Sequence, residues 1–156
     1  MKKRLLSLLL AILTCLTYGV IHSNTVFAVE AEDIDITELM TEDALIGHIE
    51  EQTWGVYLAS GESVINKISS SKVGAGGTTN AAKKCNVSIT SILERKNASG
   101  SWVRVISWTQ DNADAFYAGI SKSVTVPSGY YYRVRSYHYA GTDSASSHTN
   151  ALWVGN

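Results

Sequence analysis

Tyr and Arg side chains alternate along residues 129–139, GYYYRVRSYHY, and form the most conspicuous group of chemically capable side chains in this 156-residue sequence. Successive side chains of a strand point to opposite faces. The outward set is Tyr131, Arg133, Arg135, Tyr137 and Tyr139, and the inward set is Tyr130, Tyr132, Val134 and Ser136. Aromatic rings interleaved with guanidinium groups stack on sugar rings or pair with anionic groups. The outward set is therefore the candidate ligand-binding surface, although cross-strand Tyr and Arg pairs also stabilise exposed sheets without any ligand.

Two histidines near the C-terminus offer a second kind of chemistry. His138 and His148 flank Asp143 in the last predicted hairpin. A register that pairs His138 with Ser147 places the two imidazoles on opposite faces of the sheet, whereas zinc needs three or four converging ligands. We therefore expect no metal site and no cofactor.

Acidic side chains are scarce in the body of the chain. From Lys67 onward the only acids are Glu94, Asp111, Asp114 and Asp143. Asp111 and Asp114 fall in the polar stretch 110–115, which we expect to be a loop in which they are solvated or cap a turn. Hydrolytic catalysis needs a nucleophile with a base, or a carboxylate pair in unequal environments. The sequence shows neither, so we expect a protein that is not an enzyme.

The N-terminus has the physical properties of a signal peptide. A basic start, Met1 to Arg4, precedes an apolar run over residues 5–16, and Val26-Phe27-Ala28 suits cleavage after Ala28. The apolar run is too short for a transmembrane helix. We therefore expect residues 1–28 to be removed and the protein to be secreted, with no stable membrane anchor.

Cleavage after Ala28 would leave a single cysteine, Cys85. Alternation places Cys85 on one strand face with Val87 and Ile89, which favours a buried thiol, and an intermolecular disulfide is the alternative.

Charge divides the rest of the chain in two. Residues 29–66 hold ten acids and no Lys or Arg, whereas the residues from Lys67 onward hold ten bases and four acids. Apolar residues at spacings of three and four, with Asp35 and Glu38 as a cap, indicate a short helix in the acidic segment 29–53. This segment is either a solvated linker or a pro-segment that docks on the basic body and is removed. The net charge of +6 on the body is too small to suggest nucleic acid as a partner.

From Trp54 onward the pattern changes from helical spacing to alternation. Short strands are predicted over 54–58, 62–68, 85–96, 102–109, 118–126, 129–139 and 148–154, and the Gly-rich stretch 69–80 is expected to be a bulged strand with its turn. About seven strands with turn signals every eight to twelve residues are typical of an Ig-like antiparallel β-sandwich. We expect this domain to span residues 54–156, with most of the four tryptophans buried and one at a binding edge.

The stretch 130–136 resembles the penultimate strand of fibronectin type III domains, in which a tyrosine precedes alternating apolar and Arg positions. In that family the tyrosine hydroxyl returns a hydrogen bond to upstream backbone. The resemblance implies that Tyr130 is this corner residue.

A resemblance to an uncharacterised family of small exported Gram-positive bacterial proteins covers nearly the whole mature chain. It rests on the stretches 77–81, 93–95, 100–102 and 129–136, together with His138 and Ala140. The resemblance implies export and a β fold and assigns no activity.

Three functional classes follow from these observations. The first is a secreted, non-enzymatic β-sandwich that binds an extracellular glycan or protein through the outward Tyr and Arg set. The second is a toxin-like or antimicrobial effector held in check by segment 29–53, and the third is an enzyme built around Asp111 or Asp114 near His138. We expect the first.

Overall fold

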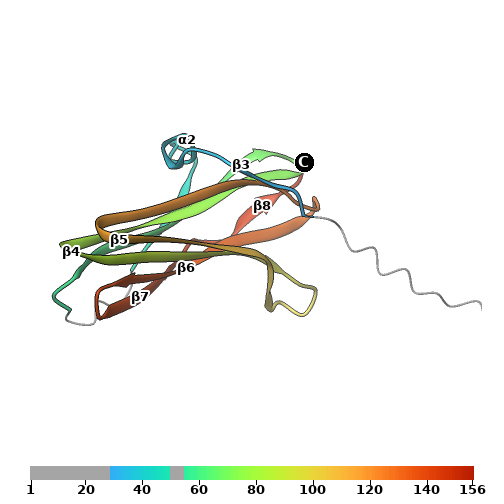
Figure 1. Cartoon of the computed structure of the whole chain (residues 1–156). Coiled ribbons are helices and arrows are strands. Elements are labelled where there is room, and N and C mark those ends of the chain that lie inside the picture. The colour runs from blue at the N-terminus through green and yellow to red at the C-terminus, as the bar shows by residue number, and fades with distance from the viewer. Residues whose placement is uncertain (1–28, 50–54) are drawn as a thin grey trace, which may run out of the picture.

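The structure, a computed structural model, describes residues 29–49 and 55–156 (Figure 1). The predicted signal peptide and Trp54 lie outside the described residues. The elements in chain order are β1 Ala31–Asp33, α2 Ile36–Leu39, β2 Leu45–His48, β3 Leu58–Ser69, β4 Lys72–Lys96, β5 Trp102–Thr125, β6 Tyr130–Ala140, β7 Asp143–His148 and β8 Leu152–Val154. The all-β prediction is confirmed: the strands form one open antiparallel sheet of eight strands, compatible with a β-sandwich. Whether the topology is Ig-like stays a prediction.

Strands β4 and β5 are 25 and 24 residues long and pair with each other along most of their length. The first part of β4 pairs with β3, and its part from Val87 onward pairs with β6. Register shifts between Asn80 and Val87 mark the place where β4 passes from one set of partners to the other. Such bulges bend a strand and increase its twist. One continuous sheet thereby folds over itself into two layers.

The core lies between the layers. Its larger cluster joins Ile65 and Val73 of one layer to Leu93, Tyr132 and Val134 of the other, and all five are fully buried. The inward prediction for Tyr132, Val134 and Ser136 agrees with their burial. A smaller cluster around Val87 and Ile89 lies toward the other end of β4.

Tyr130 does not enter this core. Its side chain is 39% exposed, with the Arg95 guanidinium 4.5 Å from its ring centroid. Tyr130 is the first residue of β6. Alternation predicts to which side of the sheet its side chain points, but not whether another layer covers the side chain there. The corner hydrogen bond belongs to Tyr132 instead, whose hydroxyl donates to the Pro127 carbonyl at 2.7 Å. The expectation for Tyr130 is therefore corrected in favour of Tyr132.

Several predicted boundaries are also corrected. Residues 110–115, expected as a loop, continue β5. The Gly-rich stretch is a turn followed by the first part of β4, which agrees with the expected strand and turn. The strand predicted over 62–68 lies within the longer strand β3, whereas residues 55–57 of the strand predicted over 54–58 are not in a strand. The final strand predicted over 148–154 is divided between the end of β7 and β8, which both pair with β6. His138 pairs with Ala145 rather than Ser147, a shift of two residues that preserves the face of every side chain. Local turn propensity is overridden here by cross-strand pairing.

The acidic segment is built into the sheet instead of forming a solvated linker. Strand β1 pairs with β5, β2 pairs with β3, and the short predicted helix is present between them as α2, capped by Asp35. Figure 1 shows α2 on the opposite side of the molecule from β6 and β7. The segment therefore crosses the outer side of the first layer from one edge to the other. Whether it is removed after secretion stays a prediction.

Gly74 allows this crossing. Leu39 of α2 is fully buried against β4, and a Cβ atom at Gly74 would collide with Leu39 Cδ1 and Asn66 Oδ1. The Asn66 amide also donates to the Leu39 carbonyl at 3.3 Å. The glycine thus provides the flat surface on which α2 packs.

Replacing Gly74 with Val should displace α2 from the sheet. We expect the midpoint of thermal unfolding to fall and a protease to cleave within residues 34–45 faster than in the wild type, because overpacking costs about 1–3 kcal/mol. The control is Ala82→Val at an exposed position of β4. Equal protease resistance of Gly74→Val and the wild type would contradict this packing.

Candidate functional site

The outward side chains of β6 lie on the outer face of the second layer, together with those of β8, the first half of β5 and the second half of β4. We call this surface the β6 face. Its five predicted members, Tyr131, Arg133, Arg135, Tyr137 and Tyr139, alternate with the buried residues of β6 and all point outward. Tyr131 and Tyr139 are 46% and 47% exposed, while the other three are half-buried. From Tyr131 to Tyr139 the row is about 27 Å long.

The two arginines of the row share one carboxylate, that of Glu94. Arg133 Nε lies 2.7 Å from Glu94 Oε2, and Arg135 Nη2 lies 3.0 Å from Glu94 Oε1. Glu94 is buried, although the sequence pattern placed it on the outward face. Each guanidinium also lies near an aromatic ring, Arg133 at 4.5 Å from the Trp102 centroid and Arg135 at 5.3 Å from that of Tyr137. The structure thus supports a structural role for Arg133 and Arg135.

Three aromatic side chains gather at one end of the β6 face. Tyr131 pairs with Trp153 of β8, and their ring centroids are 5.0 Å apart at an interplanar angle of 60°. Trp153 is 43% exposed. Trp102 is on β5, which β4 separates from β6, and the Arg133 guanidinium of β6 reaches over its ring. We call Trp102, Tyr131 and Trp153 the aromatic end.

The sequence predicted one of the four tryptophans at a binding edge without singling out Trp102 or Trp153, and it did not predict Glu94 as part of the site. The sequence does contain a signal for Trp102. The short turn after Lys96 pairs Lys96 with Trp102 across the hairpin. Lys96 lies two residues after Glu94 and so points to the same outward face, which places Trp102 on that face as well. Of the three tryptophans that the structure describes, Trp108 is buried, Trp102 is half-buried and Trp153 is exposed, so the expectation that most are buried is not met among them.

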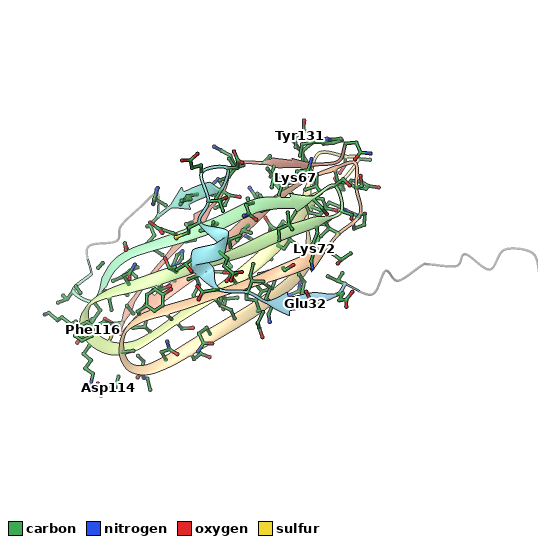
Figure 2. All side chains as sticks on the ribbon, turned by 90° about the horizontal axis from the view of Figure 1, so that it is seen from above. Glu32, Lys67, Lys72, Asp114, Phe116 and Tyr131 are labelled. Carbon is green, nitrogen blue, oxygen red and sulfur yellow. The ribbon has the colours of Figure 1, made fainter. Side chains whose placement is uncertain are left out.

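The opposite end of the β6 face is hollowed. A groove of about 310 Å³ is lined by Asn86, Val87, Ser88, Asp111, Asn112, Ala113, Tyr139 and Gly141. Asp111 pairs with Ser88 across β5 and β4, and Ser88 pairs with Tyr139 across β4 and β6. We call this feature the polar groove. Figure 2 shows Asp114 and Phe116 at the end of the molecule opposite to Tyr131.

The buried imidazole of His138 lies at the centre of a polar network inside the core. Its Nδ1 is 2.8 Å from Thr79 Oγ1, and its Nε2 is 2.8 Å from Ser147 Oγ. Further hydroxyl contacts link Ser147 to Ser63 at 2.7 Å and Ser63 to Ser136 at 2.9 Å. A Ser and a His in contact resemble a nucleophile with its base, but Ser147 and His138 are both buried. The network therefore satisfies polar groups in the core.

The remaining candidates lie apart from one another. His148 is exposed, and its strand position sets it on the opposite face from His138. The Asp143 carboxylate accepts hydrogen bonds from the backbone of Tyr57 and Leu58, and these bonds lower its pKa. Within residues 29–49 and 55–156 no group of three or more His, Cys, Asp or Glu side chains is placed to hold a metal ion.

Cys85 is half-buried and packs against the smaller core cluster. No helix within the described part of the chain is long and apolar enough to cross a membrane.

A family model described as a family of unknown function, DUF6147, matches residues 28–153. The chain belongs to this family. The match includes the acidic segment as well as the strands from β3 onward, which agrees with the packing of β1, α2 and β2 on the sheet. No curated protein and no solved structure matches the chain.

Glu94 should contribute more to stability than a surface ion-pair partner. Glu94→Gln leaves two arginines without an ionised partner, and we expect the free energy of unfolding to fall by about 1–2 kcal/mol. The control is Glu32→Gln, which breaks the exposed Lys72 to Glu32 pair at 3.2 Å and should change stability by less than about 0.5 kcal/mol. Equal changes in urea unfolding would contradict the assignment.

His138 makes stability depend on pH. Burial lowers its pKa from 6.5 to about 4, so the unfolded chain binds a proton that the folded protein excludes. This contribution is complete above pH 6.5 and is lost as the pH falls toward about 4, for a total of roughly 3 kcal/mol.

Urea unfolding at pH 7.5 and pH 4.5 measures this effect. We expect His138→Asn to be less stable at pH 7.5 and to lose less stability between the two pH values than the wild type does. The control Val87→Ala removes buried apolar atoms and no titrating group, so it should lower stability at both pH values and keep the wild-type difference. An unchanged difference in His138→Asn would show that other groups carry the pH dependence.

Proposed function

We propose that this protein is an exported, non-enzymatic binding module that holds a neutral glycan on the β6 face. The observation that carries the proposal is the exposed pair of Tyr131 and Trp153, with ring centroids 5.0 Å apart at the surface. Exposed aromatic rings present flat apolar faces on which the apolar face of a sugar can stack. Part of the proposal is that Gram-positive bacteria export the chain by removing residues 1–28, and that the sheet has an Ig-like or fibronectin type III-like topology.

The exposed groups of the β6 face favour recognition by ring stacking, and this is the basis for proposing a neutral glycan. Glu94 is bonded to Arg133 through Nε and to Arg135 through Nη2, so an anionic ligand on this row would compete with the Glu94 carboxylate for both side chains. The sequence suggested an extracellular glycan or protein as the ligand, and we propose the glycan because an exposed aromatic pair can stack on a sugar without any charged contact. Recognition then depends on ring stacking and on hydroxyl hydrogen bonds.

Calorimetric titration with cellohexaose, mannohexaose and chitohexaose tests this proposal. We expect at least one neutral hexasaccharide to bind and heparin to bind more weakly. The double variant Tyr131→Ala with Trp153→Ala should weaken binding by at least about tenfold, because each ring contributes about 0.5–1.5 kcal/mol.

The control for the double variant is Phe116→Ala. Phe116 is 54% exposed and lies at the end of the molecule opposite to Tyr131 (Figure 2). It should bind like the wild type. Equal affinities of the double variant and Phe116→Ala for the same hexasaccharide would refute a role for the aromatic end.

A second proposal is an antimicrobial or toxin-like effector restrained by segment 29–53. It is supported by two ion pairs between β1 and basic residues, Glu32 with Lys72 and Asp33 with Lys122, of which Figure 2 labels the first. Burial of Leu39 and the pairing of β1 and β2 argue instead for a permanent part of the fold. Mass spectrometry of the secreted protein decides, since an N-terminus at Val29 removes the effector argument.

A further inference from the structure

The polar groove differs from the rest of the β6 face in the chemistry of its lining. It contains no Lys or Arg, and it combines an exposed tyrosine ring with carboxylate, amide and hydroxyl groups. Tyr139 lies on one side of Ser88 and Asp111 on the other, because the three share one row across β6, β4 and β5. The ring and the carboxylate therefore stand on opposite sides of the groove.

The lining also divides into fixed and free groups. The Asn112 amide is held at both ends: its Oδ1 accepts from Gln110 Nε2 at 2.7 Å, and its Nδ2 donates to the Tyr117 carbonyl at 2.8 Å. In contrast, the side chains of Asn86, Ser88, Asp111 and Tyr139 make no hydrogen bond or ion pair to any residue that the structure describes. Four polar side chains without a hydrogen-bond partner in the described part of the chain thus line the polar groove, next to Asn112, whose side chain is fixed by its own hydrogen bonds.

These groups match the chemistry of a pyranose ring. A carboxylate accepts hydrogen bonds from two hydroxyl groups at once, an amide both donates and accepts, and a tyrosine ring stacks on the apolar face of a sugar. Ligand sites commonly combine an apolar wall with a few placed polar groups in a hollow of about 300–1,000 Å³. The absence of a basic side chain among the lining residues disfavours a uronic or sulfated sugar.

We propose that the polar groove binds one neutral sugar ring, which stacks on Tyr139 and donates hydroxyl hydrogen bonds to Asp111. This inference rests on the proposed function and adds to it a second contact point, about 27 Å along β6 from the aromatic end. A glycan that bridges both ends lies along the outward row of β6. The groove thereby sets where along the β6 face such a glycan begins.

The test uses Asp111→Asn and Tyr139→Ala, with Asp114→Asn as the matched control. Asp114 is on the same strand, but its carboxylate pairs with Lys84 at 2.6 Å and does not line the groove. The probes are the methyl pyranosides of glucose, mannose and N-acetylglucosamine, followed by the three hexasaccharides. Circular dichroism and thermal unfolding establish that each variant is folded.

We expect at least one methyl pyranoside to bind the wild type, and Asp111→Asn and Tyr139→Ala to weaken it by about tenfold, as loss of a hydrogen bond to a charged group does. Asp114→Asn and the Tyr131→Ala with Trp153→Ala variant should bind this monosaccharide like the wild type. All groove and aromatic-end variants should weaken hexasaccharide binding.

The outcomes separate the two proposals. Hexasaccharide binding that is lost in the aromatic-end variant but unchanged in Asp111→Asn and Tyr139→Ala overturns the groove inference and leaves the proposed function standing. A second outcome is that only the groove variants weaken monosaccharide binding and the aromatic-end variant leaves hexasaccharide binding unchanged. This outcome supports the groove as a sugar site and overturns the role of the aromatic end. No binding of any saccharide to the wild type overturns both.

Discussion

Pairing between β4 and β5 is the constraint on which the rest of the structure depends. These strands are longer than one layer of a small sandwich requires, so each contributes to both layers. The bend near residues 80–87 sends the first part of β4 to β3 and the second part to β6. This single hairpin therefore positions the core between the layers, the covering segment on one outer side and the β6 face on the other.

The two outer sides of the molecule differ in whether another segment of the chain covers them. On the first layer Gly74 of β4 leaves room for a covering element, and the acidic segment covers the sheet there with Leu39 buried. On the second layer the outward side chains are large, and Tyr131, Tyr139 and Trp153 remain substantially exposed. A surface of uncovered aromatic rings on a rigid sheet is well suited to recognition, because little side-chain order must be gained when a ligand binds.

Alternation in the sequence was sufficient to predict the all-β class and the two faces of β6, since side-chain direction in a strand is set by the backbone alone. It failed where exposure depends on distant partners. Tyr130 is exposed, because the other layer of the sheet does not cover the end of β6. Glu94 is buried, because two arginines that are remote in sequence pack against it. Residues 110–115 carry turn-forming side chains, yet pairing with β4 keeps most of them extended, and only Asp114 takes a positive φ of 51°. For the acidic segment the sequence left a solvated linker and a docked segment open, and it could not decide between them because the role of Gly74 beneath Leu39 is visible only in the fold.

The most direct test of the account is an NMR titration of the isotope-labelled protein with the tightest-binding neutral hexasaccharide. Backbone amide shifts should change along β6 and in its partners on the same layer, at residues 86–96, 102–112, 130–140 and 152–154. Amides in α2 and the first part of β4 should stay unchanged. Shift changes confined to the side covered by α2, or none at all with any of the three hexasaccharides, would contradict the assignment of the β6 face as a glycan-binding surface.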